Sequence, residues 1–220
     1  MKVIYSCLFG TREKLLNQNV LLKDEQNKYL LFTDQNNLKS DFWEIVYVEK
    51  EALPDRRASR LPKISPYRWL PEIYDKSIYL DNSVLITSNL TNYWDLLDDY
   101  DFIMFPHPSR KNVIQEVDHL GFLQHYEYKK MREMITEYEK LGFNLNSKIG
   151  MGTILIRNHK TETSKMQQDL WLRQVLYGSE RDQVSMGYSL WKSKIKYNFI
   201  NSSIRNNIDF KWPTRSLEQK

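Results

Sequence analysis

The sequence predicts a single α/β domain with a central, mostly parallel mixed sheet flanked by helices. Apolar segments rich in β-branched and aromatic residues alternate with amphipathic segments along the chain. The apolar segments lack a clean period of two, which is typical of strands covered on both faces. The chain has 220 residues, 41% of them hydrophobic, and this is enough for one substantial core.

Seven apolar segments are predicted to be strands, and each ends at a turn-forming or acidic residue. They are residues 2–10, 29–34, 43–49, 77–81, 84–88, 102–108 and 151–158. Helical patterns cover residues 92–100, 110–141, 164–178 and 179–194, with Gly142 as a stop signal. The domain is expected to span residues 1–205, with residues 206–220 as a C-terminal tail or linker that docks loosely or not at all.

Residues 54–72 form a basic segment with four prolines and five cationic side chains. Prolines at this density argue against one uninterrupted helix. A helix over part of the segment would place Arg56, Arg60 and Lys63 on one face, where they could bind phosphate oxygens. A solvated basic loop is the alternative.

Composition excludes some classes of protein. The net charge is only +4, too weak for the concentrated basic face of a nucleic-acid-binding protein. Cys7 is the single cysteine, so no disulfide can form within the chain, which favours a reducing compartment. No segment approaches the roughly 18 apolar residues of a membrane span. We therefore expect a soluble, cytoplasmic protein, whose oligomeric state the sequence leaves open.

Several catalytic motifs are absent. The sequence has no Walker loop and no G-x-G-x-x-G after the first strand, so neither a P-loop ATPase nor a dinucleotide-dependent dehydrogenase is indicated. It also has no H-E-x-x-H zinc motif and no G-x-S-x-G nucleophile elbow.

Carboxylates follow two of the predicted strands, Asp34 after "LLFT" and Asp81 after "SIYL", and a third, Asp182, lies in "ERDQ". Parallel strands would bring Asp34 and Asp81 to the same edge of the sheet, where open α/β folds bind ligands. Together with the basic segment they would form a metal–phosphate site. A plain turn after each strand is the alternative reading.

Several motifs occur in an order that resembles one family. They are "VIYSCLFG", "YLLFTD", "RRASRLPK", "IYLDNS", "FPHPSR" and "GTILIRNHK" followed by "ERDQVSMGYSLWK". This order resembles the TOD/MUCI-type glycosyltransferase-like domain, which has relatives in bacteria, plants and large DNA viruses, over residues 2 to 197. The order is also similar to that of the wider GT-A class of nucleotide-sugar transferases. The resemblance implies a GT-A-like, Rossmann-like fold, and the host cytoplasm as compartment if the protein is viral.

The resemblance also implies roles for individual residues. The donor nucleotide and its diphosphate would be contacted by Phe9, Gly10, Thr11, Asp34, Arg60 and Lys63. His107 and Arg110 would line the acceptor or sugar side. Asp182 and Gln183 would lie near the anomeric carbon or the acceptor hydroxyl as catalytic residues.

A divalent metal, Mn²⁺ or Mg²⁺, is the implied cofactor. Asp81 occupies the first position of the metal-binding Asp-x-Asp signature, but the second acidic position is Ser83. Many retaining members of the class use a histidine near the C-terminus, and no histidine follows His159. Either His159 is a ligand, or Ser83 and water complete the shell, or the metal is held weakly.

The resemblance thus implies a metal-assisted transferase that moves a hexose or deoxyhexose from a nucleotide diphosphate, UDP being favoured, to a sugar hydroxyl of a glycan. Retention of configuration is weakly preferred; in an inverting reaction Asp182 would be the general base. Asp182 could also be a helix-start acid that only complements the helix dipole. Two other functions remain open: a non-catalytic nucleotide- or glycan-binding domain of the same fold, and a nucleotidyltransferase.

Overall fold

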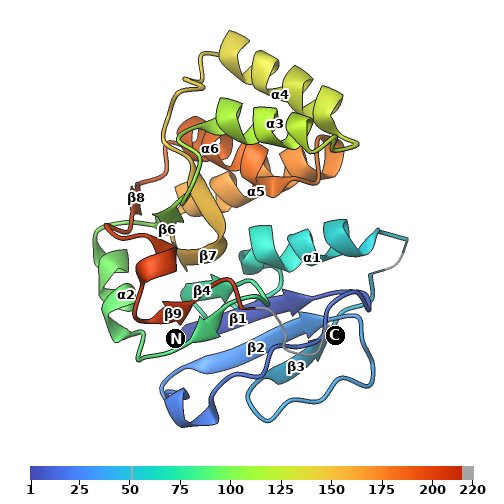
Figure 1. Ribbon diagram of the computed structural model, residues 1–220. Helices are drawn as coiled ribbons and strands as arrows, with labels where there is room; N and C mark the ends of the chain where they lie inside the picture. Colours follow the sequence, from blue (N-terminus) through green and yellow to red (C-terminus); the bar gives the residue numbers. More distant parts are fainter. Residues whose placement is uncertain (51, 215–220) are drawn as a thin grey trace.

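The computed structural model describes residues 1–50 and 52–214, and these form one α/β domain built on a seven-stranded sheet (Figure 1). The strand order is β3-β2-β1-β4-β7-β6-β8. The strands are β1 (Lys2–Leu8), β2 (Lys28–Thr33), β3 (Glu44–Tyr47), β4 (Lys76–Leu80), β6 (Phe102–Pro106), β7 (Gly150–Asn158) and β8 (Tyr197–Phe199). Only β7 runs antiparallel to its neighbours, so the expected mostly parallel mixed sheet is confirmed.

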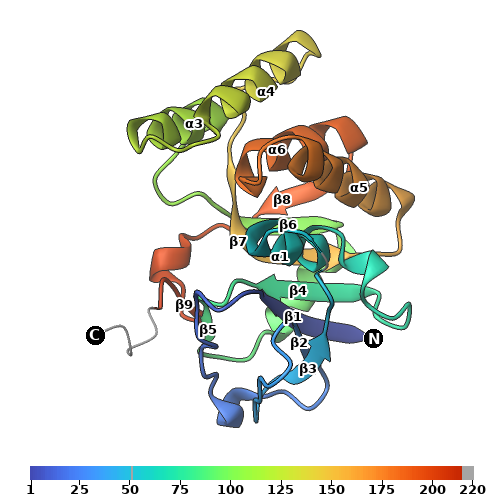
Figure 2. The same ribbon diagram turned by 90° about the vertical axis from the view of Figure 1, so that its right-hand side faces the viewer.

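Helices cover one face of this sheet in two layers (Figure 2). The layer on the sheet consists of α1 (Asp55–Ile64), α5 (Glu162–Tyr177) and α6 (Asp182–Ser193). A second layer, α3 (Val113–Phe122) and α4 (Tyr128–Lys140), packs on the outer side of α6. Because α6 is covered from both sides, nine of its twelve residues are buried, and its first residues are held rigidly over the sheet edge.

The opposite face is covered by α2 (Thr91–Asp95) and by a small sheet of β5 (Leu85–Ile86) and β9 (Phe210–Lys211). The expectation of a loosely docked tail from residue 206 is therefore wrong for the described part of that segment. Phe210 is 1% exposed and packs against Tyr93 and Phe105 in the core. Residues 215–220 lie outside the described residues.

The helical segment predicted over residues 110–141 is two helices rather than one. The chain turns back at residues 123–127, where Gln124 has a positive φ of 53°. Gly121 makes the turn possible, because a Cβ at this position would lie 2.5 Å from the ring of Tyr128. Gly142, with a φ of 95°, follows the end of α4 as predicted.

The basic segment folds as α1, which includes Pro62 and ends at Ile64, followed by a short 3-10 turn at Pro66–Arg68. The prolines thus prevent one uninterrupted helix, as expected. Pro54 is the N-cap of α1, and its carbonyl accepts a hydrogen bond from the Ala58 N–H at 2.9 Å. Its missing N–H costs the helix nothing, because the first N–H groups of a helix have no intrahelical partner. In the described residues no helix is long and apolar enough to cross a membrane.

Candidate active site

The ends of β1, β2 and β4 form one edge of the sheet. β1 pairs in parallel with both β2 and β4, so Asp34 and Asp81, which follow β2 and β4, lie at the same edge as predicted. Phe9 and Gly10, which follow β1, lie between them. β7 starts at this edge, and the carbonyl of Thr153 accepts a hydrogen bond from the Asp81 N–H at 2.8 Å.

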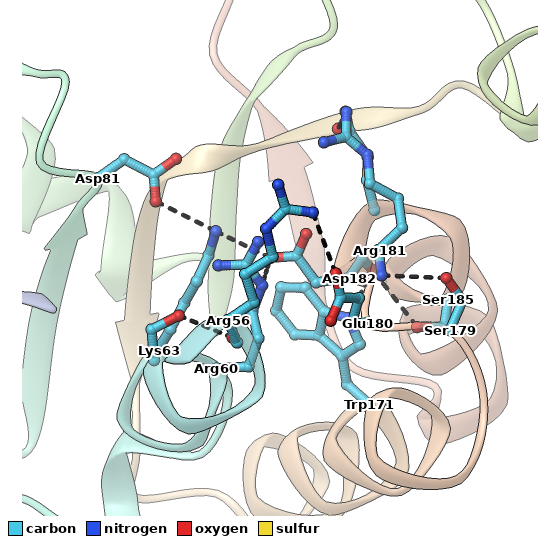
Figure 3. A network of polar contacts seen from close by, with 12 residues as sticks. Arg56, Arg60, Lys63, Asp81, Trp171, Ser179, Glu180, Arg181, Asp182 and Ser185 are labelled. Atoms are coloured by element: carbon cyan, nitrogen blue, oxygen red, sulfur yellow. Dashed lines mark hydrogen bonds and ion pairs between the residues drawn. The ribbon is translucent and has the colours of Figure 1, made fainter. Parts of the chain in front are cut away.

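Helix α1 presents Arg60 and Lys63 to this edge, one helical turn apart. Lys63 is 2% exposed, and its Nζ lies 3.2 Å from Asp81 Oδ1 and 2.8 Å from Asp182 Oδ2 (Figure 3). Arg60 Nε lies 3.3 Å from the same oxygen of Asp182. Members of three predicted groups thus meet in one ionic cluster: Arg60 and Lys63 of the donor group, Asp81 of the metal group and Asp182 of the catalytic group.

The charges in this cluster fix the ionisation of Asp182. Burial alone would raise the pKa of this carboxyl, but Arg60 and Lys63 outweigh burial and hold the pKa well below its usual range. Burial alone would lower the pKa of Arg60. Asp182 and, after it, Asp81 outweigh burial, so the pKa of Arg60 is raised. Asp182 is therefore a permanent carboxylate that binds two cations, whereas a general base needs a pKa near the operating pH.

Arg157 on β7 supports the end of α1 from below. It is fully buried, and its Nη1 donates hydrogen bonds to the backbone carbonyl of Lys63 at 2.7 Å and to Tyr5 Oη at 3.0 Å. Its guanidinium lies over the rings of Phe102 and Trp171. This contact fixes the backbone from which Lys63 extends.

Two cavities meet above the ionic cluster. The larger, of about 890 Å³, runs along the ends of β1 and β4 and is lined by Phe9, Arg12, Arg56, Tyr126 and Glu180, among others. The smaller, of about 290 Å³, is lined by Lys63, His107, Arg110, Gln183 and Trp212, among others. Both are lined by Arg60, Asp81, Ser83 and Arg181, so the two cavities share one junction.

A second ionic cluster forms the wall of the smaller cavity. Glu116 on α3 is fully buried, and its carboxylate accepts hydrogen bonds from Arg181 at 2.7 and 2.9 Å. Arg110 Nε lies 2.9 Å from its other oxygen. Burial, and after it Arg110, lowers the pKa of the adjacent His107 to about 4, so this imidazole is neutral at pH 7.

The predicted nucleotide residues near β1 and β2 form a tight turn. Asp34 Oδ1 accepts a hydrogen bond from the Gly10 N–H at 2.8 Å, and Asp34 Oδ2 lies 3.2 Å from Lys50 Nζ. Gly10 has a φ of 71°, and a Cβ there would lie 1.9 Å from an oxygen of Asp55, so only glycine fits. Thr11 and Asp34 line a further cavity of about 490 Å³ beside this turn.

Of the three proposed metal ligands, Asp81 and Ser83 lie together at the junction, but the assignment of His159 is wrong. His159 follows β7 and its N–H bonds to the carbonyl of Asp75, before β4, whereas Asp81 lies after β4. At about 3.3 Å per strand residue the two backbones are roughly 20 Å apart. Among residues 1–50 and 52–214, no three His, Cys, Asp or Glu side chains form a group that could hold a metal ion. Asp81 is therefore the single carboxylate that the predicted ligand set brings to this place, and the described residues supply no shell of three such ligands to Mn²⁺ or Mg²⁺.

His159 is instead a structural histidine. It is 6% exposed, with Nε2 2.8 Å from Ser77 Oγ and Nδ1 3.3 Å from the Gln168 amide nitrogen. Burial, and secondarily Arg157, lowers its pKa to about 3. The α5 surface that packs here is polar, Ser164, Gln167 and Gln168, because these side chains bond to His159, to Ser189 and to one another.

Protein stability should therefore fall between pH 7 and pH 5. The folded chain keeps His159 neutral, whereas the unfolded chain protonates this histidine near pH 6.5, so the unfolded state binds more protons as pH falls. The loss assigned to His159 at pH 5 is about 2 kcal/mol, and His107 adds to it in the same direction. Urea unfolding at both pH values should show a smaller pH dependence in His159→Gln; an unchanged dependence would contradict the assignment.

Sequence reasoning missed three residues of this region: Glu116, Arg157 and Arg181. Glu116 lies in a helical pattern where a surface position is the usual expectation, and Arg157 lies in a strand. One signal was available for Arg157, since an arginine inside the apolar run "GTILIRN" requires a buried partner or a functional reason. Arg181 adjoins the predicted pair Asp182 and Gln183.

Comparisons with solved structures show where this fold occurs. The chain is similar to mouse xyloside xylosyltransferase 1, with a TM-score of 0.51 at 7% identity over 91% of this chain and 85% of that one. It is also similar to an active-site mutant of LgtC (TM-score 0.47, 13% identity, 92% and 73% covered) and to the glycosyltransferase GlyE of Streptococcus pneumoniae TIGR4 (0.49, 11%, 91% and 45%). At 7% identity the likeness to the xylosyltransferase concerns the fold alone, which agrees with the GT-A-like fold expected.

No curated protein matches the sequence. The family model described as TOD1/MUCI70, glycosyltransferase-like domain, matches residues 3–211, which is nearly the whole chain and includes β9 near the C-terminus. By this match the chain belongs to the TOD1/MUCI70 glycosyltransferase-like family.

Proposed function

We propose that this protein is a nucleotide-sugar-dependent glycosyltransferase that moves a hexose or deoxyhexose to a sugar hydroxyl of a glycan, with a UDP-sugar as the favoured donor. The observation that carries the proposal is the junction of two cavities over the ionic cluster. A transferase must bring two substrates together over its charged groups, and this arrangement provides a separate space for each.

The larger cavity is the donor side in this proposal. Its volume suits a ligand of nucleotide size. Arg56, Arg60 and Arg181 line it, and guanidinium groups suit diphosphate oxygens because they donate parallel hydrogen bonds. Phe9 supplies an apolar contact at the end of β1.

The smaller cavity is the acceptor side. Arg110 and Gln183 offer hydrogen-bonding groups to sugar hydroxyls, and the Trp212 ring offers an apolar surface to a sugar ring. His107 shapes this wall, because its Nδ1 accepts from the backbone N–H of Arg110 and its Nε2 lies 2.9 Å from Arg110 Nη1. Gln183 is held in place because its Nε2 donates a hydrogen bond to the Gly150 carbonyl at 2.9 Å.

Transfer would take place at the junction. The bond between the anomeric carbon and the diphosphate oxygen breaks, and its electron pair stays with the nucleoside diphosphate. The acceptor oxygen forms the new bond, and its proton leaves with the diphosphate or to water. Arg60 and Arg181, which line the junction, offset the negative charge that develops on the leaving nucleoside diphosphate. The low pKa of Asp182 speaks against a general base and favours the retaining outcome.

Asp81→Asn tests the proposal. With a panel of UDP-, GDP- and CDP-sugars and mixed glycan acceptors, wild type should release a nucleoside diphosphate and form a glycoside. The variant should lose about 100-fold or more in turnover, because Lys63 loses one of the two carboxylates that fix its ammonium at the junction. Stability should change little, since the Asp81 side chain is 33% exposed and an asparagine oxygen can still accept from Tyr79.

Asp98→Asn is the matched control. Asp98 also pairs with a lysine, Lys76, but lies in the segment after α2, away from the junction, and its side chain is 74% exposed. It should retain wild-type turnover. Binding of nucleotides or glycans without any transfer would favour the non-catalytic domain. Release of pyrophosphate in place of a nucleoside diphosphate would favour the nucleotidyltransferase.

A further inference from the structure

Lys63 lies where the site would otherwise offer two carboxylates to a cation. Its Nζ is within 3.2 Å of both Asp81 and Asp182, and no other described lysine is as buried. The Tyr79 hydroxyl donates to the same oxygen of Asp81 at 2.6 Å, and the Tyr79 ring lies under the ammonium at 5.1 Å. Oδ1 of Asp81 and Oδ2 of Asp182 are thus already bound to protein donors or cations.

The ammonium is held in this position. Arg157 anchors the Lys63 carbonyl, Pro62 and Ile64 on either side are buried, and Lys63 itself is 2% exposed. Gly152 faces it, and a Cβ at Gly152 would lie 3.4 Å from Nζ and 3.6 Å from Asp182 Oδ2. The ammonium therefore has little freedom to leave and make room for another cation.

The charges of the cluster leave nothing for a divalent cation to neutralise. Arg60 and Lys63 balance Asp81 and Asp182, and a divalent ion bound at these carboxylates would lie within a few ångströms of the ammonium, where like charges repel strongly. Around them, the smaller cavity is lined by five cationic side chains (Arg60, Lys63, Arg110, Arg181 and Arg205) and two carboxylates. Glu116, behind the wall, offsets one of these cations. The surplus is positive, and it reaches the donor side at the junction, where Arg60 and Arg181 line both cavities and suit the donor diphosphate without added metal.

We propose that Lys63 takes the place of a divalent cation in this protein, so that donor binding and sugar transfer proceed without metal. The inference rests on the proposed function. The Lys63 ammonium keeps Asp81 neutralised, and together with Arg60 it presents fixed positive charge to the donor diphosphate. During transfer the diphosphate oxygen receives the electron pair of the broken bond next to these cations, and no redox step or further reactant is required.

The first experiment is calorimetric titration of the wild-type chain with UDP and with GDP, once in EDTA and once in excess MnCl₂. At least one of the two nucleotides should bind in EDTA, with a dissociation constant within about threefold of that in MnCl₂. Binding that requires Mn²⁺ would overturn the role of Lys63 and leave the proposed function intact. If neither nucleotide binds under either condition, the proposed UDP- or GDP-linked donor fails, and the inference fails with it.

The second experiment uses Mn²⁺ alone as the probe. Lys63→Ala leaves Asp81 and Asp182 facing an emptied space, an oxygen donor pair that Mn²⁺ accepts. Saturating MnCl₂ should raise the Tm of this variant by about 2–4 °C or more and leave wild type unchanged. Lys160→Met is the control. It removes an exposed lysine that pairs with Asp75 at the other edge of the sheet, and MnCl₂ should leave its Tm unchanged.

A Mn²⁺ shift in wild type equal to that in Lys63→Ala would contradict the inference, since the ammonium would then not exclude the metal. No shift in a folded Lys63→Ala protein would also contradict it, because the carboxylates would not be the site that Lys63 fills. If Lys63→Ala does not fold, the titrations of wild type in EDTA and MnCl₂ decide the question alone.

Discussion

Asp182→Asn is expected to lower the free energy of unfolding by about 3–5 kcal/mol, more than any other substitution that we propose. Asp182 is 4% exposed and binds both Lys63 and Arg60. The substitution keeps the shape of the side chain but leaves two cations in a poorly solvated site with only Asp81 as counter-charge. Urea unfolding followed by tryptophan fluorescence measures this change, because Trp171 donates a hydrogen bond to the Asp182 carbonyl.

The same substitution should reduce turnover by about 100-fold or more, because Lys63 and Arg60 lose the contact that fixes their position over the junction. Asp169→Asn is the matched control: Asp169 binds Tyr67 and Arg68 at the surface, and its loss should cost less than about 1 kcal/mol. If the free energy of unfolding of Asp182→Asn lay within about 1 kcal/mol of that of wild type, the prediction would be contradicted, and water would already screen the charges of the ionic cluster.

Much of the fold follows from local sequence signals, because the longer strands are apolar runs bounded by turn-forming or acidic residues and most helices show a helical pattern. The runs that become β1, β2, β4, β6 and β7 are predicted within a few residues, and the parallel pairing puts Asp34 and Asp81 at one edge. β8 and β9 are missed because they are two or three residues long and exist only through pairing with distant segments. Long-range pairing of short strands leaves no periodic signal.

The sequence predicts that charged side chains gather at this edge of the sheet, but it does not predict which of them contact one another. Spacing along α1 correctly places Arg60 and Lys63 on one face, yet it cannot show that Lys63 inserts between two carboxylates that are 18 and 119 positions away in the chain. His159 fails as a ligand for the same reason, because only the antiparallel direction of β7 sends it to the far edge of the sheet. Residue types indicate chemistry, whereas strand direction decides which residues meet.

Glu116→Gln is the second substitution with a large expected effect, and it acts on the acceptor side. Glu116 is fully buried and binds Arg110 and Arg181, which come from the loop after β6 and from the start of α6. Glutamine fills the same space without the charge, so both guanidinium groups lose their shared counter-ion. The expected loss of stability is about 2–4 kcal/mol, less than for Asp182→Asn, because Arg110 and Arg181 are partly exposed and can reach water.

The kinetic effect separates the two sides of the junction. Since Arg110 and Arg181 line the smaller cavity, Glu116→Gln should raise the KM for the acceptor several-fold more than the KM for the donor. Glu137→Gln, which removes an exposed carboxylate from Lys140 on α4, should change neither constant and should cost less than about 0.5 kcal/mol. If Glu116→Gln raised the donor KM more than the acceptor KM, the assignment of the two cavities would have to be reversed, because Arg181 lines both and Arg110 lines the smaller one.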